Sequence, residues 1–152
     1  MIALTLLFGI SVSLAAQKTP DYLRVDFPRV KLKVGASMDA SLHLKVAAGF
    51  HIQANPAARP NLIPTTVVVE KPDGLEVGQV LYPEGKPYRL KGSDSEITTY
   101  EGDVEIKLPL SATVKSKPGK RKVSGYVRFQ PCNEENCFFP SKATFSGLVD
   151  VR

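Results

Sequence analysis

Hydrophobic residues recur at every second position over much of the chain, which is the period of a β-strand with one buried face. Val30, Leu32 and Val34, for example, alternate with Lys31 and Lys33. Similar alternation marks the segments 41–46, 50–53, 103–110, 123–129 and 145–151. Turns with proline and glycine separate the runs, at 72–74, 83–85 and 118–119, and no helical period is evident. Short amphipathic strands between such turns predict an all-β protein folded as an antiparallel β-sandwich.

Two segments interrupt this rhythm. Residues 55–61 (NPAARPN) read as a proline-rich connection. Residues 84–99 (EGKPYRLKGSDSEITT) form a long polar segment in which Tyr88 and Leu90 are apolar exceptions. A loop of that length inside a compact domain is usually either functional or disordered.

The start of the chain has the character of an export signal. Residues 1–16 carry no charged side chain and are almost wholly apolar or small, and the run is too short to span a bilayer, which takes roughly 20 residues. Small residues at Ser13, Ala15 and Ala16 offer a cleavage site. We therefore expect a signal peptide over 1–16 and a single domain over 17–152, although a buried N-terminal strand is the alternative. Export would place the cysteines where disulfides persist.

The net charge of +5, from 20 basic and 15 acidic residues, is spread along the chain. A denser basic run over 115–122 lies beside Pro118 and Gly119 and reads as a solvated turn. Because aromatic residues are not interleaved with it, we expect no nucleic-acid partner, and contact with the membrane only through another protein.

The only two cysteines, Cys132 and Cys137, lie close together between two predicted strands. Such a pair can be a structural staple, half of a metal site or a redox-active dithiol. If 126–130 and 138–145 are the arms of a hairpin, the cysteines face each other at its tip, where opposed Cα atoms are about 4.5 to 5.5 Å apart and a disulfide fits. A staple closing so short a loop would contribute roughly 2 kcal/mol, against about 4.7 kcal/mol for a loop of about 100 residues. That difference favours redox use without excluding a structural bridge.

The surroundings of the pair narrow its chemistry. His43 and His51 lie in separate predicted strands without paired spacing, so we expect no metal site, and we expect no cofactor. Glu134 and Glu135 lie between the cysteines and disfavour a thiolate. This pattern is typical of a passive electron carrier that a better-activated partner thiol attacks.

Several blocks of the chain, taken in order, resemble a known family. They are 49–55 (GFHIQAN), 62–66 (LIPTT), 80–85 (VLYPEG), 100–102 (YEG) and 130–140 (QPCNEENCFFP). Their order over nearly the whole predicted domain, and the last block most specifically, resembles the N-terminal periplasmic domain of the thiol:disulfide interchange protein DsbD.

The resemblance implies a fold, a location and partners. The fold would be an immunoglobulin-like β-sandwich in the periplasm. The function would be thiol–disulfide exchange, as in a protein-disulfide reductase, with Cys132 and Cys137 as the redox pair. Electrons would come from a membrane protein and pass to thioredoxin-like periplasmic proteins, including those of cytochrome c maturation. Here the membrane donor would be a separate protein.

The resemblance also implies roles for residues around the pair. A cap loop would fall within 84–99, where Tyr88 and Leu90 either cover a sulfur or pack as ordinary loop residues. His51 and Gln53 match strand-borne aromatic positions beside the redox pair. His51 therefore either lies near a sulfur, where it could stabilise a thiolate when protonated, or is an exposed strand histidine.

Phe138 and Phe139 flank Cys137, and we expect one to pack inward and the other to form a docking surface. A second hypothesis for the whole protein remains open. It is a non-catalytic sandwich that binds a partner protein, in which the disulfide only closes a hairpin. The reduction potential of the pair separates the two hypotheses.

Overall fold

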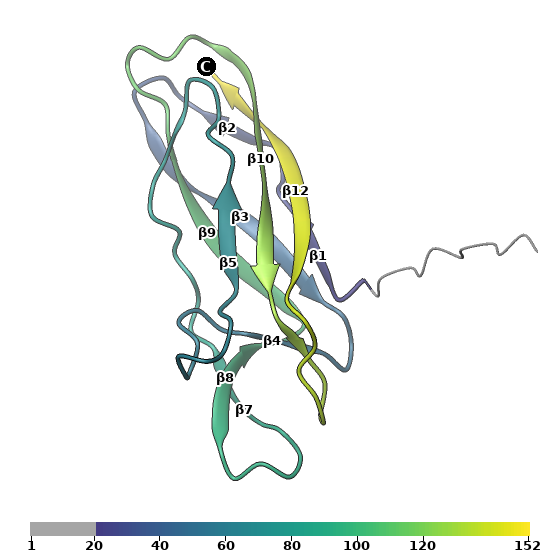
Figure 1. Ribbon diagram of the computed structural model, residues 1–152. Helices are drawn as coiled ribbons and strands as arrows, with labels where there is room; N and C mark the ends of the chain where they lie inside the picture. Colours follow the sequence, from purple (N-terminus) through teal and green to yellow (C-terminus); the bar gives the residue numbers. More distant parts are fainter. Residues whose placement is uncertain (1–20) are drawn as a thin grey trace, which may run out of the picture.

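The computed structural model describes residues 21–152, so the predicted signal peptide over 1–16 lies outside the described residues. The described part folds into β-strands joined by turns and loops (Figure 1). The strands are β1 (Leu23–Asp26), β2 (Val30–Leu32), β3 (Ser37–Val46), β4 (His51–Gln53), β5 (Thr66–Val69), β6 (Glu76–Val77), β7 (Lys86–Arg89), β8 (Glu96–Tyr100), β9 (Asp103–Ser111), β10 (Gly119–Phe129), β11 (Pro131–Cys132) and β12 (Ser141–Val151).

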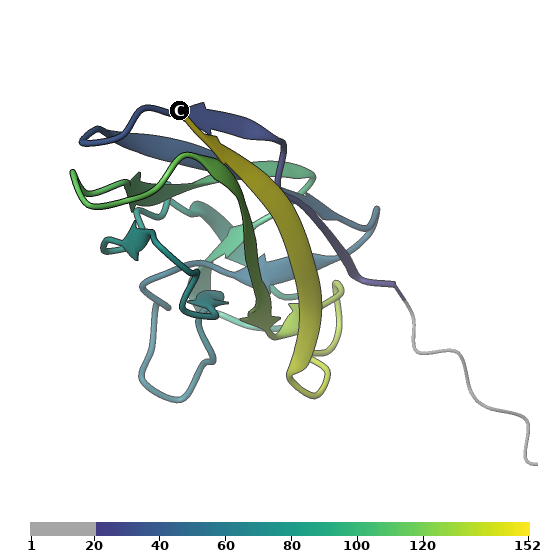
Figure 2. The ribbon, with the colours of Figure 1, turned by 90° about the horizontal axis from the view of Figure 1, so that it is seen from above.

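Two sheets of four strands form the layers of a sandwich (Figures 1 and 2). One has the order β1-β3-β9-β6 and the other β2-β12-β10-β5. The alternation in the sequence explains why the two sheets pack face to face, because each long strand points one row of hydrophobic side chains toward the other sheet. The predicted β-sandwich is therefore confirmed.

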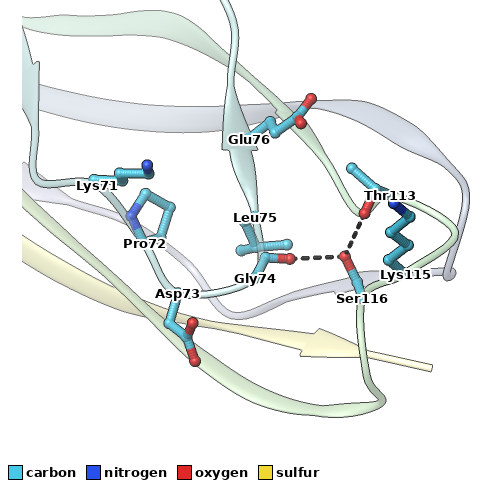
Figure 3. A pocket seen from close by; sticks show the side chains of 9 residues that line it. All are labelled: Lys71, Pro72, Asp73, Gly74, Leu75, Glu76, Thr113, Lys115 and Ser116. Atoms are coloured by element: carbon cyan, nitrogen blue, oxygen red, sulfur yellow. Dashed lines mark hydrogen bonds between the residues drawn. The ribbon is translucent and has the colours of Figure 1, made fainter.

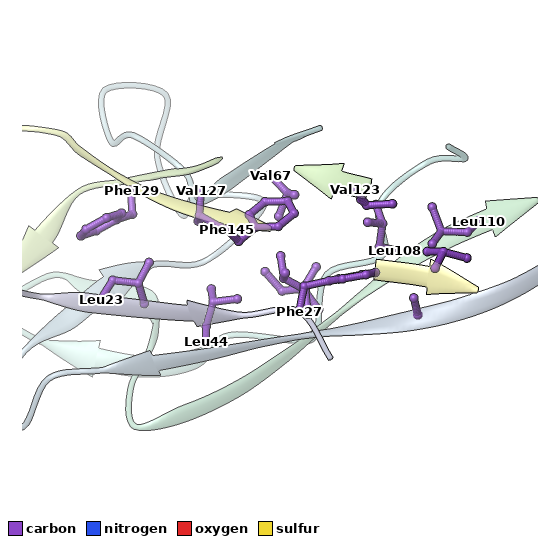
Figure 4. Packing of buried hydrophobic residues seen from close by; sticks show 14 of the residues in the cluster. Leu23, Phe27, Leu44, Val67, Leu108, Leu110, Val123, Val127, Phe129 and Phe145 are labelled. Atoms are coloured by element: carbon purple, nitrogen blue, oxygen red, sulfur yellow. The ribbon is translucent and has the colours of Figure 1, made fainter. Parts of the chain in front are cut away.

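The core lies between these layers (Figure 4). In β3 the buried residues are Ala40, Leu42, Leu44 and Val46, with more exposed residues between them. The facing strands supply the rest of the core, including Ile106, Leu108 and Leu110 of β9, Val123, Val127 and Phe129 of β10, and Phe145, Val149 and Val151 of β12. Burial of this apolar surface, at about 25 cal/mol per Å², is the main force that holds the two sheets together.

The N-terminal segment joins both layers. β1 pairs antiparallel with β3 of the first sheet, whereas β2 pairs parallel with β12 of the second. Pro28 lies between β1 and β2, where a residue without an N–H group interrupts strand pairing. Beside it, Phe27 packs so closely on Gly147 that a Cβ atom there would lie 2.2 Å from the Phe27 ring. The parallel pair is a departure from the purely antiparallel sandwich that the sequence predicts.

A third, smaller sheet of order β11-β4-β8-β7 lies at one end of the sandwich. The long polar segment 84–99 is part of it, and the expectation of an extended loop there is wrong. β7 and β8 form a hairpin in which Tyr88 lies opposite Ile97. This hairpin projects from the end of the sandwich in Figure 1. Only the residues between Arg89 and Glu96 form the hairpin loop. Ile97 is buried, which explains why so polar a segment still forms ordered strands.

Candidate functional site

The two cysteines are joined by a disulfide bond at the tip of the β10–β12 hairpin. The S–S distance is 2.05 Å, and the Cα atoms are 4.0 Å apart. Cys132 and Cys137 also form an isolated antiparallel bridge, so they face each other across the tip as the sequence predicts. The second long arm of the hairpin begins only at Ser141, three residues later than expected.

Asn133 holds the turn between the cysteines. Its Oδ1 accepts hydrogen bonds from the backbone amides of Glu135, at 3.0 Å, and Asn136, at 2.7 Å. The backbone N–H group of Asn133 donates to the Asn136 carbonyl at 2.9 Å. An Asn side chain that bonds to the backbone two residues ahead is a common way to build a tight turn. These hydrogen bonds therefore hold the turn together with the disulfide that closes it.

The two cysteines differ in their exposure. Cys132 is fully buried, with an exposed fraction of 0%, because β11 pairs with β4 and places Cys132 opposite His51. Cys137 lies outside that small sheet and is exposed to solvent. Attack on a disulfide requires access to one of its sulfurs. The structure therefore makes Cys137 the accessible member of the pair.

Gln53 contacts the buried sulfur. Its Nε2 atom lies 3.5 Å from Cys132 Sγ in a hydrogen bond, and the residue is itself fully buried. Alternation along 50–53 placed Gln53 on the polar face with His51, so the sequence reasoning missed this contact. The available signal was the match of Gln53 to a strand-borne aromatic position beside the redox pair.

His51 lies under the β7–β8 hairpin. Its ring stacks on the ring of Tyr88, with centroids 3.8 Å apart, and its Nε2 atom lies 3.2 Å from Glu101 Oε2. Only 12% of the His51 side chain is exposed. The alternative of an exposed strand histidine is therefore wrong, because Tyr88 covers the imidazole. The predicted cap residue thus packs on the strand that neighbours Cys132.

The loop of the hairpin reaches the turn between the cysteines. The Lys91 amide donates a hydrogen bond to the Glu134 carbonyl at 2.9 Å. Leu90, the other predicted cap residue, is half-buried at the start of this loop, and its carbonyl accepts a bond from the Ser93 amide. The loop of segment 84–99 thus contacts the turn between the cysteines, and its role as a cap stays a prediction.

The two phenylalanines after Cys137 point in different directions. Phe138 packs with Tyr22 and Phe50, at ring-centroid distances of 5.8 and 6.0 Å. Phe139 is 92% exposed. Phe138 therefore attaches the hairpin to the segments before β1 and β4, while Phe139 lies on the surface near the exposed cysteine.

Comparison with known families decides what kind of domain this is. Residues 21–148 match the family described as thiol:disulfide interchange protein DsbD, N-terminal. The chain belongs to this family. The resemblance carried by the sequence blocks is thereby confirmed. A search among curated proteins gave no match.

Solved structures that share the fold have sequences that differ widely from this one. A type I cohesin, the seventh of ScaB from Pseudobacteroides cellulosolvens, is 11% identical with a TM-score of 0.55, covering 86% of this chain and 92% of the cohesin. The N-terminal periplasmic domain of ScsB from Proteus mirabilis is 13% identical with a TM-score of 0.50. The match covers 84% of this chain but only 48% of the ScsB chain.

A third structure is of a complex between the DsbD N-terminal and PilB N-terminal domains from Neisseria meningitidis. The matched chain of that structure is 14% identical to this one, with a TM-score of 0.49. The match covers 87% of this chain and 88% of the matched chain. The immunoglobulin-like β-sandwich that the resemblance implies is confirmed by the two packed four-stranded sheets of this structure and by the family match over residues 21–148.

Two phenols, the buried Tyr100 and the half-buried Tyr82, are hydrogen-bonded to the segments around the small sheet. Tyr100, opposite Ile52 in β4, donates to the Pro83 carbonyl at 2.8 Å and accepts from the Asn55 amide at 3.1 Å. The Tyr82 hydroxyl accepts a bond from the Val67 amide at 2.9 Å. Burial raises the pKa of both phenols above the usual value. They fix the segments that enter and leave the small sheet.

A surface hollow lies between two loops of the sandwich (Figure 3). It is lined by residues of 71–76 and 113–116, and Ser116 Oγ donates to the Gly74 carbonyl at 2.8 Å across it. Gly74 packs near Arg121 at the start of β10, whereas Cys132 follows the end of that strand. A strand of this length spans about 35 Å, so the hollow is no part of the cysteine site.

Metal-binding clusters and membrane-spanning helices are two features that the described residues lack. Within residues 21–152, no group of three or more His, Cys, Asp or Glu side chains is arranged to hold a metal ion. The same residues contain no helix that is long and apolar enough to cross a membrane.

Proposed function

We propose that this chain is a periplasmic thiol–disulfide exchange module that carries two electrons through the reversible Cys132–Cys137 disulfide. A membrane reductant supplies the electrons, and thioredoxin-like proteins receive them. The observation that carries the proposal is the unequal placement of the two sulfurs in a member of the DsbD N-terminal family. Cys137 is open to a partner, and Cys132 is buried beside a hydrogen-bond donor.

The reaction requires only sulfur chemistry. A thiolate of a reduced partner attacks Cys137 Sγ, a partner–Cys137 bond forms, and the Cys132–Cys137 bond breaks. Its electron pair leaves with Cys132, which takes up a proton from solvent. The second partner thiolate then attacks the partner's own sulfur in the mixed disulfide and releases Cys137 as a thiolate. The partner is oxidised by two electrons and this domain is reduced by two.

Delivery of electrons is the reverse sequence. The Cys137 thiolate attacks the disulfide of an oxidised thioredoxin-like protein, and Cys132 resolves the mixed disulfide by attack on Cys137 Sγ. The protected position of Cys132 suits this second role, because the resolving thiol meets only a sulfur already attached to its own chain.

The surface around Cys137 supports contact with another protein. Phe139, two residues after Cys137, is almost fully exposed, and an exposed aromatic residue is a typical contact in protein interfaces. Glu134 and Glu135, which are also exposed, lie in the turn between Cys132 and Cys137. We propose that Phe139 docks on the partner while Tyr88 and Leu90 belong to the cap beside the cysteines.

The proposed location in the periplasm has two supports. Residues 1–16 have the composition of a signal peptide, and a disulfide persists in an oxidising compartment. The structurally similar ScsB domain is described as periplasmic.

Electron exchange with a thioredoxin-like protein tests the function directly. The oxidised domain, residues 17–152, is mixed with an equal amount of reduced thioredoxin, quenched with acid, alkylated and weighed by mass spectrometry. We expect two alkylated cysteines to form in the domain as thioredoxin loses two. A domain that stays oxidised with excess reduced thioredoxin would refute the proposal. The double variant Cys132→Ser/Cys137→Ser, which cannot accept electrons, is the control.

A further inference from the structure

The side-chain amide of Gln53 is buried without a full set of hydrogen bonds. Its Nε2 atom donates to Cys132 Sγ at 3.5 Å, and its Oε1 atom has no hydrogen-bond partner. The residue has an exposed fraction of 0%. Within residues 21–152, this is the one side-chain hydrogen bond that reaches either sulfur of the disulfide.

Such an arrangement does not favour stability of the oxidised fold. Burial of an amide removes its hydrogen bonds to water, and a disulfide sulfur is only a weak acceptor in return. An apolar side chain of similar length, such as methionine, would fill the same space without this cost. The amide is therefore better suited to the reduced or reacting protein, in which Cys132 Sγ is a thiolate or a thiol, than to the disulfide.

We infer that Gln53 is a catalytic residue of thiol–disulfide exchange, whose amide stabilises Cys132 as the leaving thiolate when a partner attacks Cys137. The inference rests on the proposed function. When the Cys132–Cys137 bond breaks, the electron pair goes to Cys132 Sγ in a fully buried place, where an unsolvated negative charge is costly. The Gln53 N–H group already points at that atom, and hydrogen bonds to charged acceptors are stronger than those to neutral ones.

The same amide also complements the protonated product. Once Cys132 has gained a proton, its S–H group is a donor, and Gln53 Oε1 is an acceptor that lacks a partner in the oxidised structure. The amide can therefore bond to Cys132 as a thiolate through Nε2 and as a thiol through Oε1. Neither methionine nor leucine at this position could do both.

The ionisable groups around Cys132 are attached to other partners. His51 faces Cys132 from β4, but its Nε2 atom lies by Glu101 and its ring lies under Tyr88. Glu134 and Glu135 in the turn are exposed. Because these groups remain in every variant below, a change at Gln53 isolates the effect of the amide.

The test begins with a Cys137→Ala background, in which Cys132 is the single thiol. The pH at which its thiolate forms is followed by absorbance at 240 nm, with and without Gln53→Met. Loss of one charge-assisted hydrogen bond changes an equilibrium by about tenfold, so we expect the midpoint to rise by about one pH unit. In the protein with both cysteines, we expect Gln53→Met to slow reduction by dithiothreitol at pH 7 by about tenfold.

A matched control is Gln130→Met in the same backgrounds. Gln130 lies in the cysteine hairpin, between β10 and β11, and its Nε2 atom donates to the Phe138 carbonyl while its Oε1 atom accepts from the Ile63 amide. It should leave the ionisation midpoint of Cys132 unchanged. If Gln53→Met fails to fold, Gln53→Glu keeps the shape and replaces the donor with a negative charge, which should raise the midpoint further.

An ionisation midpoint within about 0.3 pH units of the parent in folded Gln53→Met, with an unchanged reduction rate, would overturn the inference. Failure of the proposed function is a separate result, seen as absence of exchange between the parent domain and thioredoxin. The Cys132 titration does not depend on that exchange, so the two failures can be told apart.

Discussion

The backbone amide of Lys91 donates a hydrogen bond to the carbonyl oxygen of Glu134, 2.9 Å away. Residues far apart in the sequence are thereby joined, one in the loop of the β7–β8 hairpin and the other in the turn between the cysteines. The bond couples the position of the loop to the conformation of the turn. We therefore expect reduction of the disulfide to alter the position of the β7–β8 hairpin loop through this hydrogen bond.

Hydrogen exchange at Lys91 should report this coupling. In the oxidised protein we expect the Lys91 amide to be protected, because its acceptor lies in a turn closed by the disulfide. Reduction frees the turn, and we expect the protection of Lys91 to fall while that of core amides such as Val127 is retained. Nuclear magnetic resonance of both redox forms measures each amide. Equal protection of Lys91 in both forms would show that the loop and turn are uncoupled.

The single-cysteine variants should differ in reactivity. Cys132→Ser leaves the exposed Cys137, and Cys137→Ser leaves the buried Cys132. Because thiol reactivity depends on access, we expect the Cys132→Ser variant to react with Ellman's reagent on the order of tenfold faster or more. The same variant should be the one that traps a mixed disulfide with thioredoxin. Equal rates for the two variants would contradict the assignment of Cys137 as the attacked residue.

Phe138 and Phe139 form a matched pair that tests which of the two side chains stabilises the fold. Phe138 packs against two other rings, so we expect Phe138→Ala to lower the free energy of unfolding by about 1–3 kcal/mol. Phe139 is exposed, so we expect Phe139→Ala to change it by less than about 0.5 kcal/mol. Urea unfolding measures both values. A larger loss for Phe139→Ala than for Phe138→Ala would contradict the packing.

Tyr82 and Tyr100 should make stability fall in alkaline solution. Burial raises the pKa of both phenols in the folded protein, so above about pH 10 the unfolded chain has lost phenol protons that the folded chain still holds. Their contribution is complete below that pH and is lost as the pH rises through the raised pKa values. Urea unfolding at pH 9 and pH 11 should show a smaller loss for Tyr82→Phe/Tyr100→Phe than for the parent. An equal loss in both proteins would refute this explanation.

The fold could be predicted largely from alternation, because most of the core lies on long strands with one buried face. Leu42, Leu44 and Val46 of β3, or Ile106, Leu108 and Leu110 of β9, carry that signal in consecutive alternate positions. The parallel pairing of β2 with β12 could not be predicted, since the crossing at Pro28 depends on contacts distant in sequence.

The site was predicted less completely. Cys132 and Cys137 were evident as a close pair, but their unequal burial depends on the pairing of β11 with β4. Alternation does not reveal the burial of Gln53, because this residue lies on a strand of only three residues at the end of the sandwich, where both faces can be covered; only the resemblance places it beside the pair. The β7–β8 hairpin was missed because its polar composition conceals three buried residues of β8, Ile97, Thr99 and Tyr100.

The reduction potential of the Cys132–Cys137 pair tests the central claim most directly. The domain over residues 17–152 is equilibrated in a series of glutathione or dithiothreitol redox buffers, and the reduced fraction is measured after alkylation. An exchanging disulfide should have a potential between about −200 and −270 mV, in the range of thioredoxins and glutaredoxins. A value below about −300 mV would mark a structural bridge and contradict the proposed function.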